Sequence, residues 1–375
     1  MPGLRVLVCT VVHHPQDARI LHRQIRAMLD AGYTVTYAAP FSAYATTAWP
    51  ELTAIDLPRA LGRHRSDALR AARHVLRTHG ADADVVLLHD PELLLVLPGL
   101  DLPGAVVWDV HEDTAAALVA KSWLPGPVRP MARAGVRMVE DWAERNLRLI
   151  LAEPGYRSRF RRIHPVVPNT TYVPESAAPT GANRVVYVGH LSVARGVDVM
   201  LDAARLLAGS GLDVDVVGHA DSYSRRALVR AQQEGFLRWH GYVPNDRALA
   251  LVDGALCGLS LLRDLPNYRH SMPTKVLEYM AHGVPVVSTP LPAAVSLTQV
   301  NKCGLLVPFD DAEATVSAIL RLRDDAELRA SMGKRGHAVA RTGYHWPQTA
   351  REFLMRLEAW ADAARPHQCI TLGTL

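Results

Sequence analysis

A helix followed at once by a buried strand is expected for Lys275-Val276-Leu277-Glu278-Tyr279-Met280-Ala281-His282-Gly283-Val284-Pro285-Val286-Val287-Ser288-Thr289. Pro273 suits the first turn of a helix, because proline has no N–H to lose there, and Gly283 suits the left-handed position after a helix end. Free N–H groups and an ammonium at the helix start form a site for an anion such as phosphate. Glu278 lies one turn further, where its carboxylate could accept hydrogen bonds from a ribose but would repel a phosphate.

This pattern resembles the donor-site signature of retaining GT-B glycosyltransferases of family 4. In that family a helix of the form K-x-x-E-Y-M-A-x-G-x-P-V-V grips a nucleotide sugar. The alternative explanation is an ordinary amphipathic helix that leads into an α/β sheet. Motifs elsewhere in the chain are needed to decide between these two explanations.

The length of 375 residues predicts two domains. A hydrophobic content of 49% and a charged content of 21% are typical of a globular protein with a full core. The four cysteines are scattered without metal-binding or disulfide spacing, which favours reduced thiols and a cytoplasmic protein. We expect no signal peptide, no membrane-spanning segment and no nucleic-acid partner. The arginine-rich helix expected within 59–77 leaves peripheral contact with a membrane or an anionic acceptor open, beside the simpler explanation of a solvated face.

Buried strands alternate with helices through the first half of the chain. The opening unit resembles a Rossmann βαβ without its glycine-rich phosphate loop, which argues against a dinucleotide at this turn. Three strands of this half, the opening one among them, are expected to end in histidine and acidic residues. Because ligands gather outside the carboxyl ends of parallel strands, we expect a polar cleft lined by His13, His14, Asp17, His89, Asp90, His111, Glu112 and Asp113.

These strand ends resemble the H-P-x-D-x-R-I, H-D-P-E-L and D-V-H-E-D motifs of a bacterial subgroup of family 4. The resemblance assigns them to the acceptor side and places His111 beside the reacting sugar. A metal site is the rival explanation, but the histidines lack the spacing of a metal-binding helix pair. Asp82-Ala83-Asp84 and Asp213-Val214-Asp215 come at strand entries, the wrong end for a D-x-D metal site.

A hinge is expected at 173–183, which is rich in Pro, Thr and Ala. A second α/β series follows from Arg184. Gly189-His190-Leu191-Ser192-Val193-Ala194-Arg195-Gly196 resembles the family motif G-R-x-x-x-x-K-G, whose two cations neutralise the leaving diphosphate. His190 and Arg195 stand in the two cationic positions here, and only Arg195 keeps a fixed charge.

Further donor contacts are implied by the same resemblance. Tyr242 belongs to a segment that family members place against the nucleotide base. Many members also have an E-x7-E pattern, in which the first Glu contacts the donor sugar and the second the ribose. Counting back from Glu278 reaches His270, so the ribose-type Glu is present and the sugar-type Glu is absent. The remaining donor positions are Ser271, Pro273 and Thr274.

The sequence therefore predicts a GT-B fold, with two Rossmann-like domains facing each other across a cleft. The expected parts are an acceptor domain at 1–172, the hinge at 173–183, a donor domain at 184–345, a helix at 346–364 that crosses back to the first domain, and a tail at 365–375. The expected activity is transfer of a hexose-type sugar from a nucleoside diphosphate, with UDP favoured, to an acceptor hydroxyl or amine. The acceptor would be a small molecule or a lipid- or glycan-linked group.

By resemblance, the anomeric configuration is retained and neither a metal nor another cofactor is needed beyond the nucleotide sugar. The expected catalytic residues are His111, Arg195 and Lys275. Two other classes remain open. A nucleotide-sugar 2-epimerase shares the architecture and would turn over the donor without an acceptor, and a two-domain sugar- or nucleotide-binding protein would have no catalysis.

Overall fold

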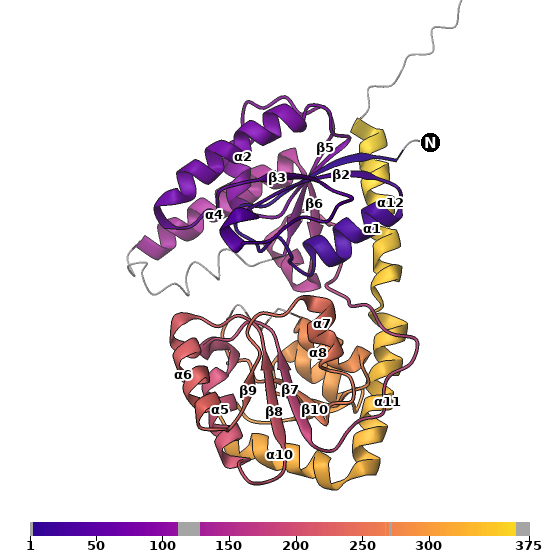
Figure 1. The fold of residues 1–375 in the computed structure, drawn as a ribbon. Helices are drawn as coiled ribbons and strands as arrows, with labels where there is room; N and C mark the ends of the chain where they lie inside the picture. The colour runs from indigo at the N-terminus through magenta and orange to yellow at the C-terminus, as the bar shows by residue number, and fades with distance from the viewer. Residues whose placement is uncertain (1–2, 112–127, 267, 270–271, 365–375) are drawn as a thin grey trace, which may run out of the picture. The chain divides into compact units, whose positions relative to one another are not determined.

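The computed structural model describes residues 3–111, 128–266, 268–269 and 272–364. The chain forms two compact units (Figure 1). The first unit comprises residues 1–168 and 349–375, and the second comprises residues 169–348. Each unit is built around its own sheet.

The first unit contains a six-stranded parallel sheet in the order β3-β2-β1-β4-β5-β6. Its strands are β1 (Arg5–Cys9), β2 (Thr34–Ala39), β3 (Thr53–Asp56), β4 (Val85–Leu88), β5 (Ala105–Val110) and β6 (Arg148–Leu151). Its helices are η1 (Ile20–Ile25), α1 (Arg26–Asp30), η2 (Ser42–Tyr44), η3 (Gly62–His64), α2 (Arg65–His79), η4 (Pro91–Val96), α4 (Arg129–Asn146), η6 (Pro154–Arg159) and most of α12 (Trp346–Ala364).

The second unit repeats this plan with the order β12-β11-β10-β7-β8-β9. Its strands are β7 (Arg184–Val188), β8 (Asp213–Val217), β9 (Arg238–Trp239), β10 (Cys257–Ser260), β11 (Val286–Ser288) and β12 (Gly304–Leu306). Its helices are η7 (Val193–Arg195), α5 (Val197–Leu206), α6 (Ser222–Gln233), α7 (Asn245–Ala250), α8 (Thr274–Ala281), α9 (Pro292–Ala294), η8 (Val295–Gln299), α10 (Ala312–Asp324) and α11 (Ala326–Gly343).

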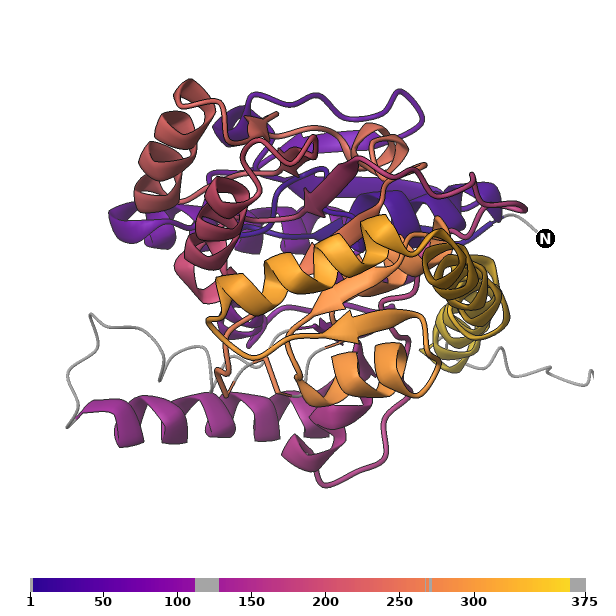
Figure 2. The ribbon, with the colours of Figure 1, turned by 90° about the horizontal axis from the view of Figure 1, so that it is seen from below.

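Helices cover both faces of each sheet, so the central strands are buried on both sides and consist mainly of apolar residues, whereas the edge strand β3 is largely exposed. In the first unit α2 and α4 pack on one face, and α4 is one continuous helix (Figures 1 and 2). The end of α12 packs on this unit through buried Phe353 and Leu357, and Tyr33 donates to Glu358 at 2.7 Å. In the second unit α5, α6 and α10 share one apolar cluster, and α7, α8 and α11 share the other.

The expected fold class is confirmed: the two parallel six-stranded Rossmann-like sheets and the terminal helix are those of the GT-B fold. The helix and strand expected within 275–289 are α8 and β11, and Gly283 between them has a positive φ, 68°, as expected. The pair Asp82/Asp84 lies before β4, where Asp84 accepts from the Arg5 N–H, so it is a strand entry as expected.

Candidate active site

Lys275 is the second residue of α8, and its side chain is buried within the second unit. Its Nζ donates to the hydroxyl of Tyr187 at 2.8 Å and lies 3.9 Å from the centre of that ring. The Tyr187 hydroxyl in turn donates to the carbonyl of His190 at 2.7 Å. Burial lowers the pKa of Lys275 well below its usual value, and the charge of Arg195 lowers it further. An anion bound here would relieve both effects.

Two glycines bring the backbone close to this ammonium. Gly189 follows β7 with φ of +136°, and Gly218 follows β8 with φ of +139°. A Cβ at Gly218 would lie 1.8 Å from the carbonyl oxygen of Gly189, so only glycine fits. A Cβ at Gly189 would lie 3.6 Å from Nζ of Lys275. A ligand beside Lys275 therefore meets bare backbone at the carboxyl end of β7.

Arg195 ends η7, and its guanidinium carbon lies 6.0 Å from the centre of the Tyr268 ring. It contributes positive charge at both Lys275 and His190. Partial burial, followed by the charge of Arg195, lowers the pKa of His190. The second cationic position of the motif therefore holds an imidazole whose surroundings oppose protonation, which leaves Arg195 and Lys275 as the two cations.

Tyr242 stacks on His219, with ring centres 4.7 Å apart and an interplanar angle of 17°. Tyr242 is 37% exposed, so part of this aromatic pair faces solvent. His219 was not anticipated, although a signal was present: β7 and β8 are neighbours, and both are followed by Gly-His. The electrostatic surroundings of His190 include both His219 and Lys275, which places the stacked pair near the cations.

The other predicted donor positions lie at the start of α8. Pro273 immediately precedes the helix, Thr274 is its first residue, and Glu278 is buried in its second turn. Among the described residues no side chain caps α8, so its first N–H groups are available to a ligand. His270 and Ser271 lie outside the described residues.

The first unit brings four of the predicted acceptor-side residues together at the carboxyl edge of its sheet. Nε2 of His111 lies 2.8 Å from Nε2 of His13, and His13 Nε2 lies 3.2 Å from Asp90. His89 is completely buried, with Nδ1 3.3 Å from a carboxylate oxygen of Asp109. The His89 and His111 rings are 5.6 Å apart.

Asp109 contacts both His89 and His111 in this cluster and was not among the predicted site residues. Both of its carboxylate oxygens accept from Arg19 at 2.7 Å, and one accepts from Gln24 at 2.9 Å. Burial alone would raise the pKa of Asp109, but Arg19 and then His89 hold it well below its usual value. A charged residue inside the apolar strand Ala105–Val110 was the signal that could have identified it.

The hydrogen bonds determine which nitrogen of His111 carries the proton. Nδ1 lies 3.0 Å from the backbone carbonyl of Asp109, which can only accept, so the proton is on Nδ1. Nε2 then accepts from His13 at 2.8 Å. Burial, followed by the neighbouring His13, lowers the pKa of His111 to about 3. His111 is therefore a neutral imidazole at physiological pH.

The remaining acceptor-side residues divide into three groups. Asp17 accepts from the N–H groups of Arg19 and Ile20 at 2.8 and 3.1 Å; burial opposes its ionisation, but His13 and His111 lower its pKa. The His14 ring lies beside that of Tyr44, with ring centres 4.5 Å apart and an interplanar angle of 55°. Glu112 and Asp113 lie outside the described residues.

A metal ion has one candidate set of ligands in the described part of the chain: His89, Asp109 and His111 have ligand atoms within 4.8 Å of one another. The fit is poor. Both oxygens of Asp109 already accept from Arg19, and Nδ1 of His111 faces a carbonyl. A metal ion at this point would have to displace the guanidinium of Arg19. The cluster is therefore poorly suited to bind a metal.

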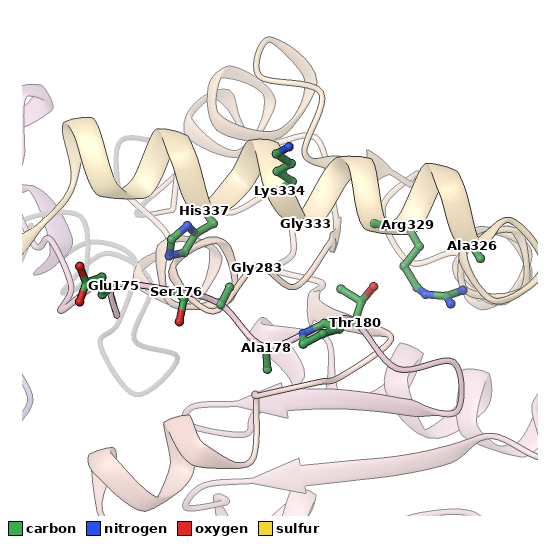
Figure 3. A pocket seen from close by; sticks show the side chains of 13 residues that line it. Glu175, Ser176, Ala178, Thr180, Gly283, Ala326, Arg329, Gly333, Lys334 and His337 are labelled. Atoms are coloured by element: carbon green, nitrogen blue, oxygen red, sulfur yellow. The ribbon is translucent and has the colours of Figure 1, made fainter.

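A pocket of about 450 Å³ in the second unit lies at the opposite edge of the sheet from Lys275, beside Gly283 and α11 (Figure 3). Arg329 donates there to the carbonyls of Leu322 and Arg323, and His337 pairs with the carbonyl of Pro174. These basic groups hold α11 to α10 and to the segment before β7. The pocket is therefore structural packing and not the predicted donor site.

Comparison with known proteins gives a family match within the second unit. Residues 182–325 match the family model "Glycosyl transferases group 1". An amylovoran biosynthesis glycosyltransferase of Erwinia amylovora is 27% identical over 144 residues, 37% of this chain and 35% of that protein. The chain spans half or less of the length of the curated relatives it matches.

Solved structures extend the likeness of fold over nearly the whole chain. Sucrose-phosphate synthase from Thermosynechococcus elongatus aligns with a TM-score of 0.75 at 18% identity, covering 97% of this chain and 100% of that one. The Anabaena protein HepE, in complex with UDP and glucose, aligns with a TM-score of 0.67 at 12% identity, covering 95% and 100%. Residues 182–325 thus match the group 1 glycosyltransferases, and the chain has the GT-B fold over nearly its whole length.

Proposed function

We propose that this protein transfers a hexose-type sugar from a nucleoside diphosphate, preferably UDP, to an acceptor hydroxyl or amine. The observation that carries the proposal is the buried ammonium of Lys275, which lies against the backbone of Gly189 with Arg195 nearby. This arrangement lies within the residues that match the family model. A diphosphate is the ligand whose charge and size suit two cations beside an uncapped helix start.

The barrier to the reaction is departure of the diphosphate from an oxocarbenium-like sugar. Lys275 and Arg195 stabilise the negative charge that develops on the leaving oxygen, from positions that need no rearrangement during the step. Glu278, one turn further along α8, holds the ribose hydroxyls. Tyr242 and His219 offer a flat surface for the base, and HepE, which shares the fold, binds UDP. Retention and independence of metal are part of the proposal through the family resemblance.

The first unit contributes the acceptor side. A neutral His111 can exchange its hydrogen bond with His13 for one with a sugar hydroxyl, because both imidazoles are already desolvated and aligned. The carboxylate of Asp90 holds His13 in place. It also accepts hydrogen bonds from the hydroxyl of Thr10 at 2.9 Å and from the N–H of Val12 at 3.2 Å. His111 therefore acts as a hydrogen-bonding group and not as a charged acid.

Thermal unfolding with UDP, GDP, ADP and dTDP and their sugars tests the donor assignment. A ligand at 100 times its Kd adds about 2.7 kcal/mol of stability, and we expect the uridine compounds to give the largest shift. Lys275→Met should lose this shift, whereas Lys334→Met on α11 should keep it. No stabilisation by any nucleotide would refute the proposal. Conversion of a nucleotide sugar without any acceptor would point to an epimerase instead.

In the described ranges, none of the helices is long and apolar enough to cross a bilayer. Whether the acceptor is a free metabolite or a membrane-linked glycan is a question for an acceptor screen with both kinds of compound, once the donor is known.

A further inference from the structure

A second polar pocket lies in the first unit, at the opposite edge of the sheet from the histidines. Its volume is about 360 Å³. It lies at the amino ends of β5 and β6, beside the last turn of α4 and the end of α12. Its polar side chains are Arg145, Asn146, Arg148 and Arg162, and Trp360 forms an aromatic wall.

The three arginines bring positive charge into this pocket without a negative counterpart. The residues that line it include no Asp or Glu. In the described ranges, Arg145, Arg148 and Arg162 form no ion pair with a carboxylate, whereas the neighbouring Arg159 and Arg161 pair with Glu140 and Asp141.

The carboxylate of Glu144, the residue before Arg145, already has hydrogen-bond partners of its own. Glu144 accepts from the backbone N–H of Arg162 at 2.7 Å and from His164 at 2.9 Å. The guanidinium of Arg162 reaches only the backbone carbonyl of Glu144, at 3.4 Å. Arg145, Arg148 and Arg162 are exposed, and in the described ranges most of their side-chain donor groups have no protein partner.

We propose that this pocket binds an oxyanion, and that its ligand is a small phosphorylated molecule or inorganic phosphate. Like charges that converge on one concave site repel one another unless an anion neutralises them. Guanidinium groups bind phosphoryl oxygens through two parallel hydrogen bonds, which suits a pocket with three of them. The flat indole of Trp360 can pack against the organic part of such a ligand. Binding would tie the end of α12 to β5 and β6.

The test measures thermal unfolding of the full chain with inorganic phosphate, pyrophosphate and a sugar phosphate, each against KCl at equal ionic strength. The Lys275→Met background removes the contribution of the donor site, so the outcome does not depend on the proposed function. We expect a saturable rise in Tm beyond that in KCl. Arg145→Gln and Arg148→Gln should each weaken the apparent affinity about tenfold.

Arg133→Gln and Arg137→Gln are matched controls, because these exposed arginines lie on the same helix, α4, outside the pocket. They should leave the affinity unchanged. Binding should also alter the fluorescence of Trp360, and Trp360→Phe should remove that signal, which gives a readout even if an arginine variant folds poorly. A rise in Tm no larger than in KCl, or equal losses in the pocket and control variants, would overturn the proposal. A response to phosphate alone favours a free ion, and a stronger one to the sugar phosphate favours a metabolite; both support the site.

Discussion

Replacing Lys275 by methionine should have opposite effects on activity and on the stability of the ligand-free protein. Methionine is unbranched and can follow the same path past Gly189, so packing is largely kept. The ammonium that would stabilise the leaving diphosphate is lost, and removal of one such donor typically costs about 2.7–4 kcal/mol, or 10²–10³ in kcat. The free protein, however, no longer has to bury a charge whose pKa is strongly lowered by burial.

The size of the ligand effect can be worked out for a chosen concentration. At 100 times the wild-type Kd, UDP adds about 2.7 kcal/mol. If the substitution weakens binding about 10²-fold, the same concentration adds only about 0.4 kcal/mol. For a domain of this size, 1 kcal/mol corresponds to about 2–4 °C, so the shift in Tm should fall from about 5–11 °C to about 1–2 °C.

The assay combines thermal unfolding with and without UDP and the rate of sugar transfer. We expect the Tm of the free variant to equal or exceed that of the wild type. Lys334→Met, on α11 of the same unit, should change neither quantity. A variant that loses stability in the free state but keeps its response to UDP would refute the reasoning, because Lys275 would then be a structural residue and not a ligand-binding one.

Four further outcomes are expected. Asp109→Asn should destabilise the first unit by about 3–5 kcal/mol in chemical denaturation, because it removes the carboxylate that pairs with a buried guanidinium. Asp84→Asn, whose partner is exposed, should cost less than about 1 kcal/mol. Gly218→Ala should abolish the UDP-induced Tm shift, because the added Cβ would collide with the carbonyl of Gly189. Gly209 also has a positive φ but has open space around it, so Gly209→Ala should keep the shift. EDTA should leave transfer unchanged, and loss restored by Zn²⁺ or Mn²⁺ would assign a metal to the histidine cluster. A bound diphosphate raises the lowered pKa of Lys275, so nucleotide binding should take up protons and should tighten as the pH falls toward that pKa. Calorimetry in buffers of different ionisation enthalpy measures the number of protons taken up. Release of protons on binding would contradict the prediction.

The elements that local chemistry dictates were predicted well from the sequence. The alternation of buried strands and helices in the first half follows from short, mainly apolar runs between polar segments, such as those at 34–39, 85–88 and 105–110. The start of α8 and the turn at Gly283 follow from the residues at those positions alone. The segment 189–196 was likewise identified by its glycines and its arginine.

What the sequence could not predict depends on contacts between distant residues. Tyr187 is an ordinary strand residue until the fold places it 2.8 Å from Lys275, 88 residues away. Asp109 and Arg19 are separated by 90 residues. Proximity of this kind comes from the order of strands in a sheet, which single-sequence patterns do not specify.

The charges at the two sheet edges indicate which part of a nucleotide sugar each unit can receive. At the carboxyl edge of the second sheet, Lys275 and Arg195 lower the pKa of neighbouring groups by their positive charge, so an anion is favoured there. At the same edge of the first sheet, Arg19 is already paired with Asp109, Asp17 has a lowered pKa, and His111 is neutral. A diphosphate placed there would meet fixed carboxylates and no available cation from this group, whereas an uncharged hydroxyl would meet a desolvated imidazole. Under the proposed function, the anionic half of the donor would therefore bind to the second unit by attraction and would be repelled by the first.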